Sequence, residues 1–285
     1  MPVGVNQHGF EECDGILYSV AGETFDSGWQ IANDVYAYDP TTDQWTQKTD
    51  LPMQVQSPIL RAVNGKLYLI GGLDETQAAR ADVYEYDPDA NTWTKKADMP
   101  TAREDMGSAV YDGKIYVFGG LGPPSTPTKV LEIYNPATDQ WTLGANMPGY
   151  KHLGDFGCEL NGKIYAVGGQ NVMTGYPLLV PENSVYMYDP FADTWASKAD
   201  IPLSTCYKEV VAFRAKLFVF SGCITNTTTY TNAAYSYDPT RNEWGTAGIN
   251  APYAARGIGA CVYNGEIYIC GGFDGAPVKK LYKVS

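Results

Sequence analysis

The sequence is poor in the side chains that enzymes most often use for acid–base and metal chemistry. It contains only two histidines, His8 and His152, which excludes a zinc or copper site built on three histidines. It contains no H-E-x-x-H motif, Gly-rich phosphate loop, G-x-S-x-G elbow or D-x-[DN]-x-[DN]-G calcium loop. We therefore predict no catalytic residue, no metal and no cofactor.

Basic charge is scarce as well. Lys and Arg number 20 against 32 Asp and Glu, a net charge of −12, and no basic cluster reverses the sign locally. Such a surface repels phosphate, so we expect neither nucleic-acid nor anionic-membrane binding. There is no apolar run of about 18 to 20 residues and no signal-peptide pattern. These features predict a soluble protein without membrane insertion.

The six cysteines show no C-x-x-C spacing. Most of them fall in apolar, strand-like runs, which predicts buried, reduced thiols. A reducing compartment follows from that interpretation, so a cytoplasmic location is favoured over a piece excised from a secreted or surface protein. The six residues are Cys13, Cys158, Cys206, Cys223, Cys261 and Cys270.

What the sequence does contain is a repeat. A Tyr-Asp-Pro or Tyr-Asn-Pro triplet recurs five times, beginning at Tyr38, Tyr86, Tyr134, Tyr188 and Tyr237. Each time a tryptophan follows the tyrosine by seven residues, at Trp45, Trp93, Trp141, Trp195 and Trp244. Equal spacing in every copy indicates one structural unit used repeatedly.

A second block precedes each triplet and occurs six times. It consists of a turn, an apolar strand and a small pair, as in Gly65-Lys66-Leu67-Tyr68 followed by Gly71-Gly72. Asn-Gly and Asp-Gly dipeptides before the strand are typical of tight hairpins. Each copy therefore predicts four short strands. One such sheet cannot bury both faces alone, so neighbouring copies must stack, with Trp and Tyr between them.

These residues resemble the kelch repeat, in a form similar to prokaryotic members, and the resemblance covers nearly the whole chain. It implies an all-β, six-bladed β-propeller with four antiparallel strands per blade. We predict one domain over residues 1–285, with blades at about 1–52, 53–100, 101–148, 149–202, 203–252 and 253–285. Ala21, Ser221 and Ala215 replace glycines of the pattern, so blades one and five are expected to be less regular.

The repeat register predicts that the last blade lacks its outer strand. Pro2 precedes Gly15 by 13 residues, as Pro52 precedes Gly65, so residues 1–2 match the end of a fourth strand. No tryptophan segment stands before them, and the chain ends after a third strand. The favoured interpretation is a piece of a longer protein, and the alternative is a natural three-stranded blade.

The resemblance implies that partners bind on the face that carries the loops after the tryptophan strands and after the small pairs. Family members often place an arginine a few residues after the proline, which Arg103 and Arg256 match and Lys151 replaces. For each residue the competing interpretation is a solvated loop side chain or an ion pair inside the ring. Trp29 is the one tryptophan outside the repeat, either structural or an exposed binding surface. The candidate binding residues are Gln7, His8, Trp29, Gln54, Gln56, Arg103, Tyr150, Lys151, His152, Tyr207, Tyr253 and Arg256.

Carboxylates on the innermost strands form a further group, which we expect to line the central channel or to pair with Lys and Arg. They are Glu11, Glu12, Asp155, Glu159 and Glu209. The sequence favours a monomeric, non-catalytic scaffold for a protein, peptide or glycan. The alternatives are a small-molecule enzyme, such as a sugar epimerase, mutarotase or oxidase, and a structural repeat segment of a larger surface protein. In the enzyme alternative, His8 or His152 acts with a Tyr or Glu at the channel mouth.

Overall fold

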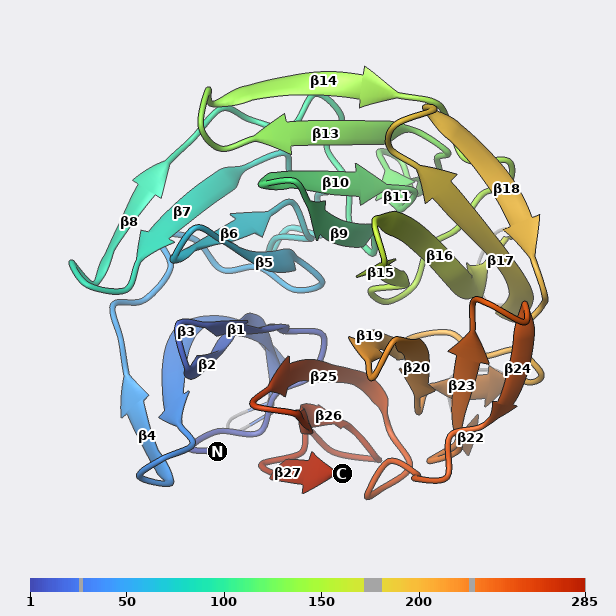
Figure 1. Ribbon diagram of the computed structural model, residues 1–285. Coiled ribbons are helices and arrows are strands. Elements are labelled where there is room, and N and C mark those ends of the chain that lie inside the picture. Colours follow the sequence, from blue (N-terminus) through green and yellow to red (C-terminus); the bar gives the residue numbers. More distant parts are fainter. Residues whose placement is uncertain (26–27, 172–180, 226–228, 285) are drawn as a thin grey trace.

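The computed structural model describes residues 1–25, 28–171, 181–225 and 229–284. Within these residues there is no helix long and apolar enough to cross a membrane. Six antiparallel sheets stand around a central axis as a closed ring (Figure 1). This arrangement confirms the predicted six-bladed propeller.

Blades one to five have four strands each, ordered outward from the axis as they follow in the chain. Blades one and two consist of β1 (Gly9–Cys13), β2 (Ile16–Thr24), β3 (Gln30–Asp39), β4 (Gln44–Gln47), β5 (Ile59–Val63), β6 (Lys66–Ile70), β7 (Val83–Asp87) and β8 (Thr92–Lys95). Blades three and four consist of β9 (Gly107–Tyr111), β10 (Lys114–Phe118), β13 (Leu131–Asn135), β14 (Gln140–Gly144), β15 (Gly157–Leu160), β16 (Lys163–Gln170), β17 (Pro181–Asp189) and β18 (Thr194–Lys198). Blade five consists of β19 (Glu209–Phe213), β20 (Lys216–Phe220), β23 (Ala234–Asp238) and β24 (Glu243–Thr246).

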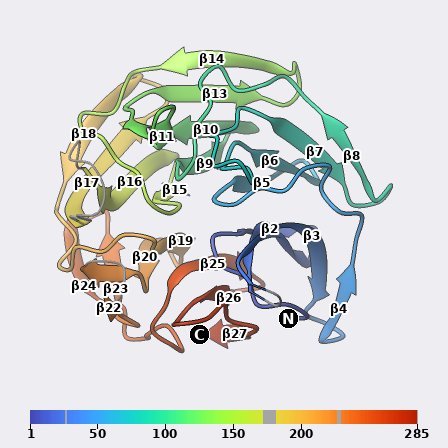
Figure 2. The same ribbon diagram turned by 180° about the vertical axis from the view of Figure 1, so that it is seen from behind.

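Blade six has three strands, β25 (Arg256–Tyr263), β26 (Glu266–Phe273) and β27 (Leu281–Val284), as the repeat register predicted. Two small hairpins extend from the loops of blades three and five. They are β11 (Leu121–Gly122) with β12 (Thr126–Pro127), and β21 (Cys223–Thr225) with β22 (Thr229–Tyr230). In both views the two termini lie near each other, the N-terminus between β4 and β27 and the C-terminus at the far end of β27 (Figures 1 and 2).

The glycine pairs are required by close contact between blades. Gly72 has a φ of +100°, and a Cβ there would lie 2.6 Å from the carbonyl oxygen of Gln56. At the preceding position Ala21 and Ser221 both adopt a φ of 60°, a left-handed conformation that disfavours side chains. The irregularity expected for blades one and five is therefore backbone strain, and the ring remains intact.

Neighbouring blades are joined by a repeated pair of hydrogen bonds, which we call the interblade clasp. The indole N–H of Trp93 donates to the carbonyl of Thr49 at 3.0 Å, and the amide of Thr49 donates to Oδ1 of Asn91 at 2.9 Å. Both partners of Thr49 belong to the next blade. The clasp recurs at Ala97 with Trp141 and Asp139, at Ala145 with Trp195 and Asp193, and at Ala199 with Trp244 and Asn242.

The ring closes where blade six meets blade one. Phe10 and Leu17 of blade one pack against Cys261, Tyr268 and Cys270 of blade six, with Met1 partly buried beside them. No tryptophan strand stands outside β27 within the described residues. Closure therefore rests on the inner strands.

Candidate binding face

The two predicted sets of loops lie on one face because their backbones pair. In every blade the residue after the small pair forms an antiparallel bridge with the fourth residue after the proline. These six rungs are Asn6–Glu23, Gln56–Leu73, Glu104–Leu121, His152–Gln170, Cys206–Cys223 and Arg256–Phe273. The backbone pairing of the rungs is equivalent in each blade, so the rungs differ from one another in their side chains.

The channel mouth lies inside the ring of rungs. Next to the rungs, Gln7, Ser57, Asp105 and Tyr207 adopt the left-handed conformation, with φ between 50° and 52°. Leu153 and Gly257 are their counterparts in blades four and six, with φ of 72° and 60°. A cavity of about 50 Å³ at the mouth is lined by Gln7, His8, Asp105, Asp155, Tyr207 and Glu209, among others. Three of the predicted residues, Gln7, His8 and Tyr207, therefore meet here.

Two adjacent carboxyl groups at the mouth, Glu104 and Asp105, have raised pKa values. Burial, reinforced by the neighbouring Asp105, raises the pKa of Glu104 to about 8. Burial raises the pKa of Asp105 to about 6, against hydrogen bonds from Ser57 and Gly154 and the attraction of Arg256. Burial also raises the pKa of Tyr207 well above its ordinary value, so its hydroxyl stays protonated. The mouth thus combines carboxyl groups with the one guanidinium of Arg256.

Beside the mouth lies a run of touching aromatic rings, which we call the aromatic platform: Phe25, Trp29, Phe273 and Tyr230. Ring centroids are 5.3 Å apart for Phe25–Trp29, 5.4 Å for Trp29–Phe273 and 6.1 Å for Tyr230–Phe273. Arg256 lies 5.2 Å from the centroids of both Phe273 and Tyr207. Trp29 is 52% exposed and Phe25 49%. Trp29 is thus exposed while it packs between Phe25 and Phe273, and its role in binding stays a prediction.

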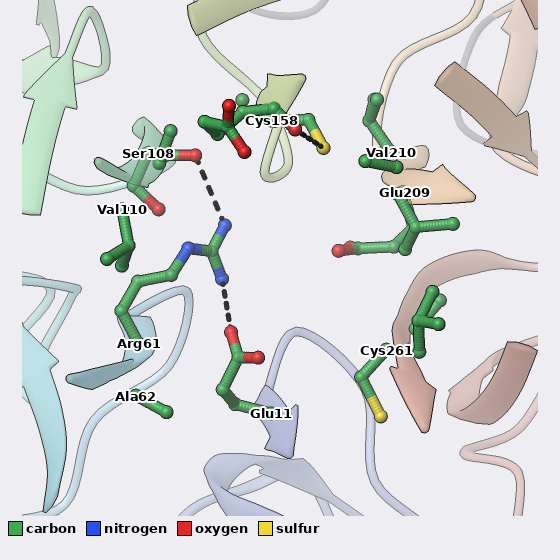
Figure 3. A pocket seen from close by; sticks show the side chains of 16 residues that line it. Glu11, Arg61, Ala62, Ser108, Val110, Cys158, Glu209, Val210 and Cys261 are labelled. Carbon is green, nitrogen blue, oxygen red and sulfur yellow. Dashed lines mark hydrogen bonds and ion pairs between the residues drawn. The ribbon is translucent and has the colours of Figure 1, made fainter. Parts of the chain in front are cut away.

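The central channel holds a second polar group (Figure 3). Arg61 forms an ion pair with Glu11 at 3.2 Å and another with Asp155, inside a cavity of about 250 Å³. Glu209 points into the same space and has no hydrogen bond or ion pair among the described residues. Burial raises the pKa of Glu11 to about 7 despite Arg61, and burial also raises the pKa of Glu209 well above its ordinary value.

Four of the five predicted inner-strand carboxylates therefore line the channel or its mouth: Glu11, Asp155, Glu159 and Glu209. Glu12 and Glu159 also cap hairpin turns. Glu12 accepts the amide of Gly15 at 2.6 Å, and Glu159 accepts that of Gly162 at 2.6 Å. No group of three His, Cys, Asp or Glu side chains with metal-binding geometry occurs in the described part of the chain.

Arg103 and Lys151 do not reach the rim, which corrects their prediction as binding residues. Both are fully buried. Arg103 pairs with Glu132 at 2.5 Å and donates to the carbonyl of Gly119 at 2.8 Å. Lys151 pairs with Glu182 and donates to the carbonyls of Gly168 and Ser184, each at 2.9 Å. The interpretation as ion pairs inside the ring holds for these two residues.

His8, His152 and Gln56 are buried under the loop face. Neither nitrogen of either imidazole has a hydrogen-bond partner among the described residues, and burial lowers both pKa values to about 4. Both histidines are therefore neutral at physiological pH. No hydrogen bond or ion pair joins His8, His152, Arg103 and Arg256 within the described residues, so these four do not form an acid–base centre.

The remaining predicted residues are dispersed. Gln54 is exposed in the loop before β5. The ring of Tyr150 lies 4.9 Å below the ammonium of Lys129. The hydroxyl of Tyr253 donates to the carbonyl of Gly271 at 2.5 Å, behind the face.

The sequence analysis missed Asp105, Arg61 and Phe273. A signal existed for two of them. Phe273 directly follows Gly271-Gly272, and Asp105 stands five residues after Pro100, as Tyr207 stands five after Pro202. Aligning the six repeats column by column would have shown that these positions converge. Arg61 has no such signal, because only the ring places it opposite Asp155.

Comparisons with known proteins agree with this architecture. A family model described as Attractin/LZTR1 beta-propeller matches residues 17–282. Kelch-like protein 35 of Mus musculus is 30% identical over 113 residues, 40% of this chain and 18% of that protein. Kelch repeat and BTB domain-containing protein 12 of Danio rerio is 27% identical over 121 residues, 40% and 19% of the two chains. Less than a fifth of each relative is therefore matched.

A solved structure titled "Structure of YjhT" superposes with a TM-score of 0.82 and 17% identity. It covers the whole of this chain, which in turn covers 96% of that one. At this identity the likeness shows the fold alone.

Proposed function

Since the chain belongs to the Attractin/LZTR1 β-propeller family, we propose that it is a non-catalytic module that recognises a segment of a protein partner on its loop face. The observation that carries this proposal is the half-exposed Trp29 within the aromatic platform. An indole held by ring contacts on two sides loses little conformational freedom when a partner covers it.

The composition of the platform supports a macromolecular ligand. Binding energy at protein interfaces concentrates in Trp, Tyr and Arg, and here Trp29, Tyr230 and Arg256 lie together across three blades. Separate blades supply the residues, so the ring itself fixes their spacing. The surface is thus preorganised by the fold.

Charge sets the expected character of the partner. The chain carries a net charge of −12, and Asp105 and Glu23 interact electrostatically with Arg256 at the mouth. A ligand with an apolar or aromatic anchor for the platform and a basic residue for the mouth fits this distribution. We expect binding to weaken with added salt, because the charged contacts are solvent-accessible.

The test begins with selection of random 12-residue peptides displayed on phage against the 285-residue chain. Affinities of the selected synthetic peptides are then measured by calorimetry. Trp29→Ala is expected to weaken binding by about 10- to 100-fold, as for an interface hot spot. The matched control is Phe191→Ala, which removes a fully exposed aromatic ring from the turn between β17 and β18 on the opposite face.

Equal affinity for the Trp29→Ala variant and the unmodified chain would contradict the proposal. A glycan array is screened in parallel with the same variants. Tryptophan-dependent binding to a glycan and to no peptide would move the proposal from a protein to a carbohydrate partner.

One observation favours a second candidate function, that of a small-molecule enzyme. Glu104, with a pKa near 8, is a neutral acid at pH 7 that lies next to Asp105 and near Tyr207, an arrangement suited to proton transfer. Saturation-transfer NMR on reducing sugars tests this candidate. Accelerated anomeric exchange that disappears in Glu104→Gln supports it, and exchange at the uncatalysed rate rejects it.

A further inference from the structure

One rung of the loop face consists of two cysteines. In blade five the residue after the small pair is Cys223, and the fourth residue after the proline is Cys206. The amide of Cys206 donates to the carbonyl of Cys223 at 3.1 Å, and the amide of Cys223 donates to the carbonyl of Cys206 at 2.8 Å. Residues that exchange both hydrogen bonds in an antiparallel pair have Cα atoms about 5.5 Å apart and side chains on the same face. No other two cysteines face each other in this way in the described part of the chain.

The spacing across this rung suits a disulfide. Disulfides join cysteines whose Cα atoms are about 4.4–6.8 Å apart, and an antiparallel rung falls inside that range. A hydrogen bond joins the two thiols, so the sulfur atoms already lie in contact. Both thiols are free in this structure. Closing the bond therefore requires a rotation of the two side chains and no shift of the strands.

The surroundings make the two thiols unequal. The hydrogen bond with Cys223 and the nearby amine of Lys208 lower the pKa of Cys206, although burial opposes this shift. The same hydrogen bond, together with burial, raises the pKa of Cys223. Nζ of Lys208 donates to the carbonyl of Thr205 at 2.7 Å, which holds the amine beside the rung. Cys206 is therefore the better nucleophile of the pair.

We propose that Cys206 and Cys223 are a reversible dithiol–disulfide pair that small peroxides, such as hydrogen peroxide, oxidise. The thiolate of Cys206 attacks one peroxide oxygen, the O–O bond breaks, and a sulfenic acid and hydroxide result. The thiol of Cys223 then attacks the sulfur of the sulfenic acid, and the S–O bond breaks. The two protons of the thiols and the departing oxygens leave as two water molecules, so the thiols lose two electrons and the peroxide gains them. Two equivalents of a thiol such as glutathione reverse the step by exchange and become its disulfide.

Burial makes the pair selective for small oxidants. Cys206 and Cys223 are fully buried, and Leu153, Tyr207 and Tyr230 pack around them. An oxidant reaches the sulfur atoms when this cluster opens locally, and a small molecule needs less opening than a large one. We therefore expect oxidation to be slower than that of an exposed thiol.

The disulfide would connect two parts of the loop face. It closes a covalent loop of residues 206–223 that contains β19 and β20. Tyr207 beside Cys206 lines the channel mouth, whereas Tyr230 pairs with Cys223 and belongs to the aromatic platform. Oxidation thus fixes the mouth relative to the platform at blade five. The thiols react whether or not the platform binds a protein segment, and the test uses no ligand of that face.

The test is a peptide map of the reduced 285-residue chain after treatment with hydrogen peroxide in the native state. The protein is then unfolded, the remaining thiols are alkylated with iodoacetamide, and trypsin releases peptides 199–208 and 217–241. These peptides carry Cys206 and Cys223. We expect the two peptides to be joined, with their combined mass lowered by two hydrogen atoms. Dithiothreitol added to the native oxidised protein should separate them.

The chain supplies an internal control. Cys261 and Cys270 are both buried and lie on neighbouring strands, but Cys261 faces Tyr268 and Cys270 faces Gly259. Both fall in the tryptic peptide 257–279. We expect this peptide to carry two alkylated thiols and no internal disulfide, because neighbouring cysteines that are not opposite each other lack the required geometry.

Variants test the roles of the two thiols. Cys206→Ser and Cys223→Ser should each abolish the joined peptides. Dimedone, which traps sulfenic acid, should label Cys206 in Cys223→Ser about tenfold or more faster than it labels Cys223 in Cys206→Ser. Cys158→Ser is the matched control, because it removes the one cysteine of the six that is only half-buried and should leave the joined peptides unchanged.

A melting experiment gives a second measurement. Oxidation of the unmodified chain should raise its melting temperature by about 3–10 °C, since the disulfide restricts the unfolded chain. Cys206→Ser should lose this increase. The peptide map of the unmodified chain decides the proposal even where a variant does not fold.

Three results would overturn the proposal. The first is full alkylation of both Cys206 and Cys223 after overnight treatment with millimolar peroxide. The second is an equal yield of disulfide within peptide 257–279, which would show oxidation without regard to the rung. The third is a disulfide that dithiothreitol reduces only after the protein is unfolded, which would make it a fixed part of the fold.

Discussion

Arg103 and Lys151 stand at the same position before two successive blades, and each buries its charge against a carboxylate on the third strand of its own blade. Arg103 reaches Glu132 on β13, and Lys151 reaches Glu182 on β17. The two carboxylates occupy different registers: Glu132 pairs with Val117, and Glu182 with Gly169. Two different cationic side chains thus form a buried ion pair at the same position of blades three and four.

Removing the Arg103 charge should destabilise the fold strongly. Arg103→Met leaves Glu132 buried without its partner and the carbonyl of Gly119 without a donor, which is expected to cost about 3–5 kcal/mol. Arg103→Lys should cost less, since Lys151 meets the same requirement in the next blade. Urea unfolding measures both variants. Equal losses would show that the guanidinium geometry matters more than the charge.

Glu104→Gln should stabilise the protein at alkaline pH. The pKa of Glu104 in the fold is about 8 against an ordinary 4.5, so the folded state holds an extra proton between these values. Stability is therefore lost as pH rises through this window, and the amide removes that loss. We expect no difference below pH 4.5 and a gain of about 1–3 kcal/mol above pH 8. Thermal melts across pH 4–9 provide the measurement.

His8 and His152 should make the fold sensitive to mild acid. Both have a pKa near 4 in the fold, below the ordinary 6.5, so only the unfolded chain takes up their protons between these values. Each therefore costs up to about 1.4 kcal/mol per pH unit as pH falls from 6.5 to 4. The double change to leucine removes no protein hydrogen bond among the described residues and should flatten this slope. If the slope of stability against pH is unchanged in this double variant, groups other than the two histidines cause the acid sensitivity.

Amide exchange should be fastest at the sixth blade. β27 has a neighbour on one side only, whereas β13, its counterpart in blade three, is covered by β10 and β14. Exchange mass spectrometry is expected to show faster deuteration of peptides covering β27 than of those covering β13. Equal protection in the two strands would contradict an open edge.

The repeat itself was legible in the linear sequence. The spacings of Tyr, Trp, Pro and Gly predicted the number of blades and the number of strands in each blade, including the missing outer strand of blade six. They could do so because each blade is built almost entirely from local hairpins. Pairing between neighbouring strands produces a sequence pattern within about 50 residues, and its repetition makes the pattern easy to recognise.

Whether a charged side chain is buried or exposed could not be predicted from the sequence in the same way. Arg103 and Arg256 stand three and four residues after their prolines, yet Arg103 is fully buried and Arg256 lies partly exposed over Tyr207 and Phe273. A shift of one residue turns the side chain to the other side of the strand. The distance of each arginine from its proline did not show which residue forms the backbone bridge. The sequence therefore did not decide whether either side chain points inward or outward.

The sequence alone determined the kind of unit, how many times it recurs and which aromatic residues hold successive units together, since these depend on contacts near in the chain. Only the tertiary structure decided what gathers on the axis and at its mouth. Arg61 meets Asp155 from 94 residues away, and Trp29 meets Phe273 across the closure of the ring. These contacts join residues of different blades and depend on how the blades are arranged around the ring, which no local sequence pattern specifies.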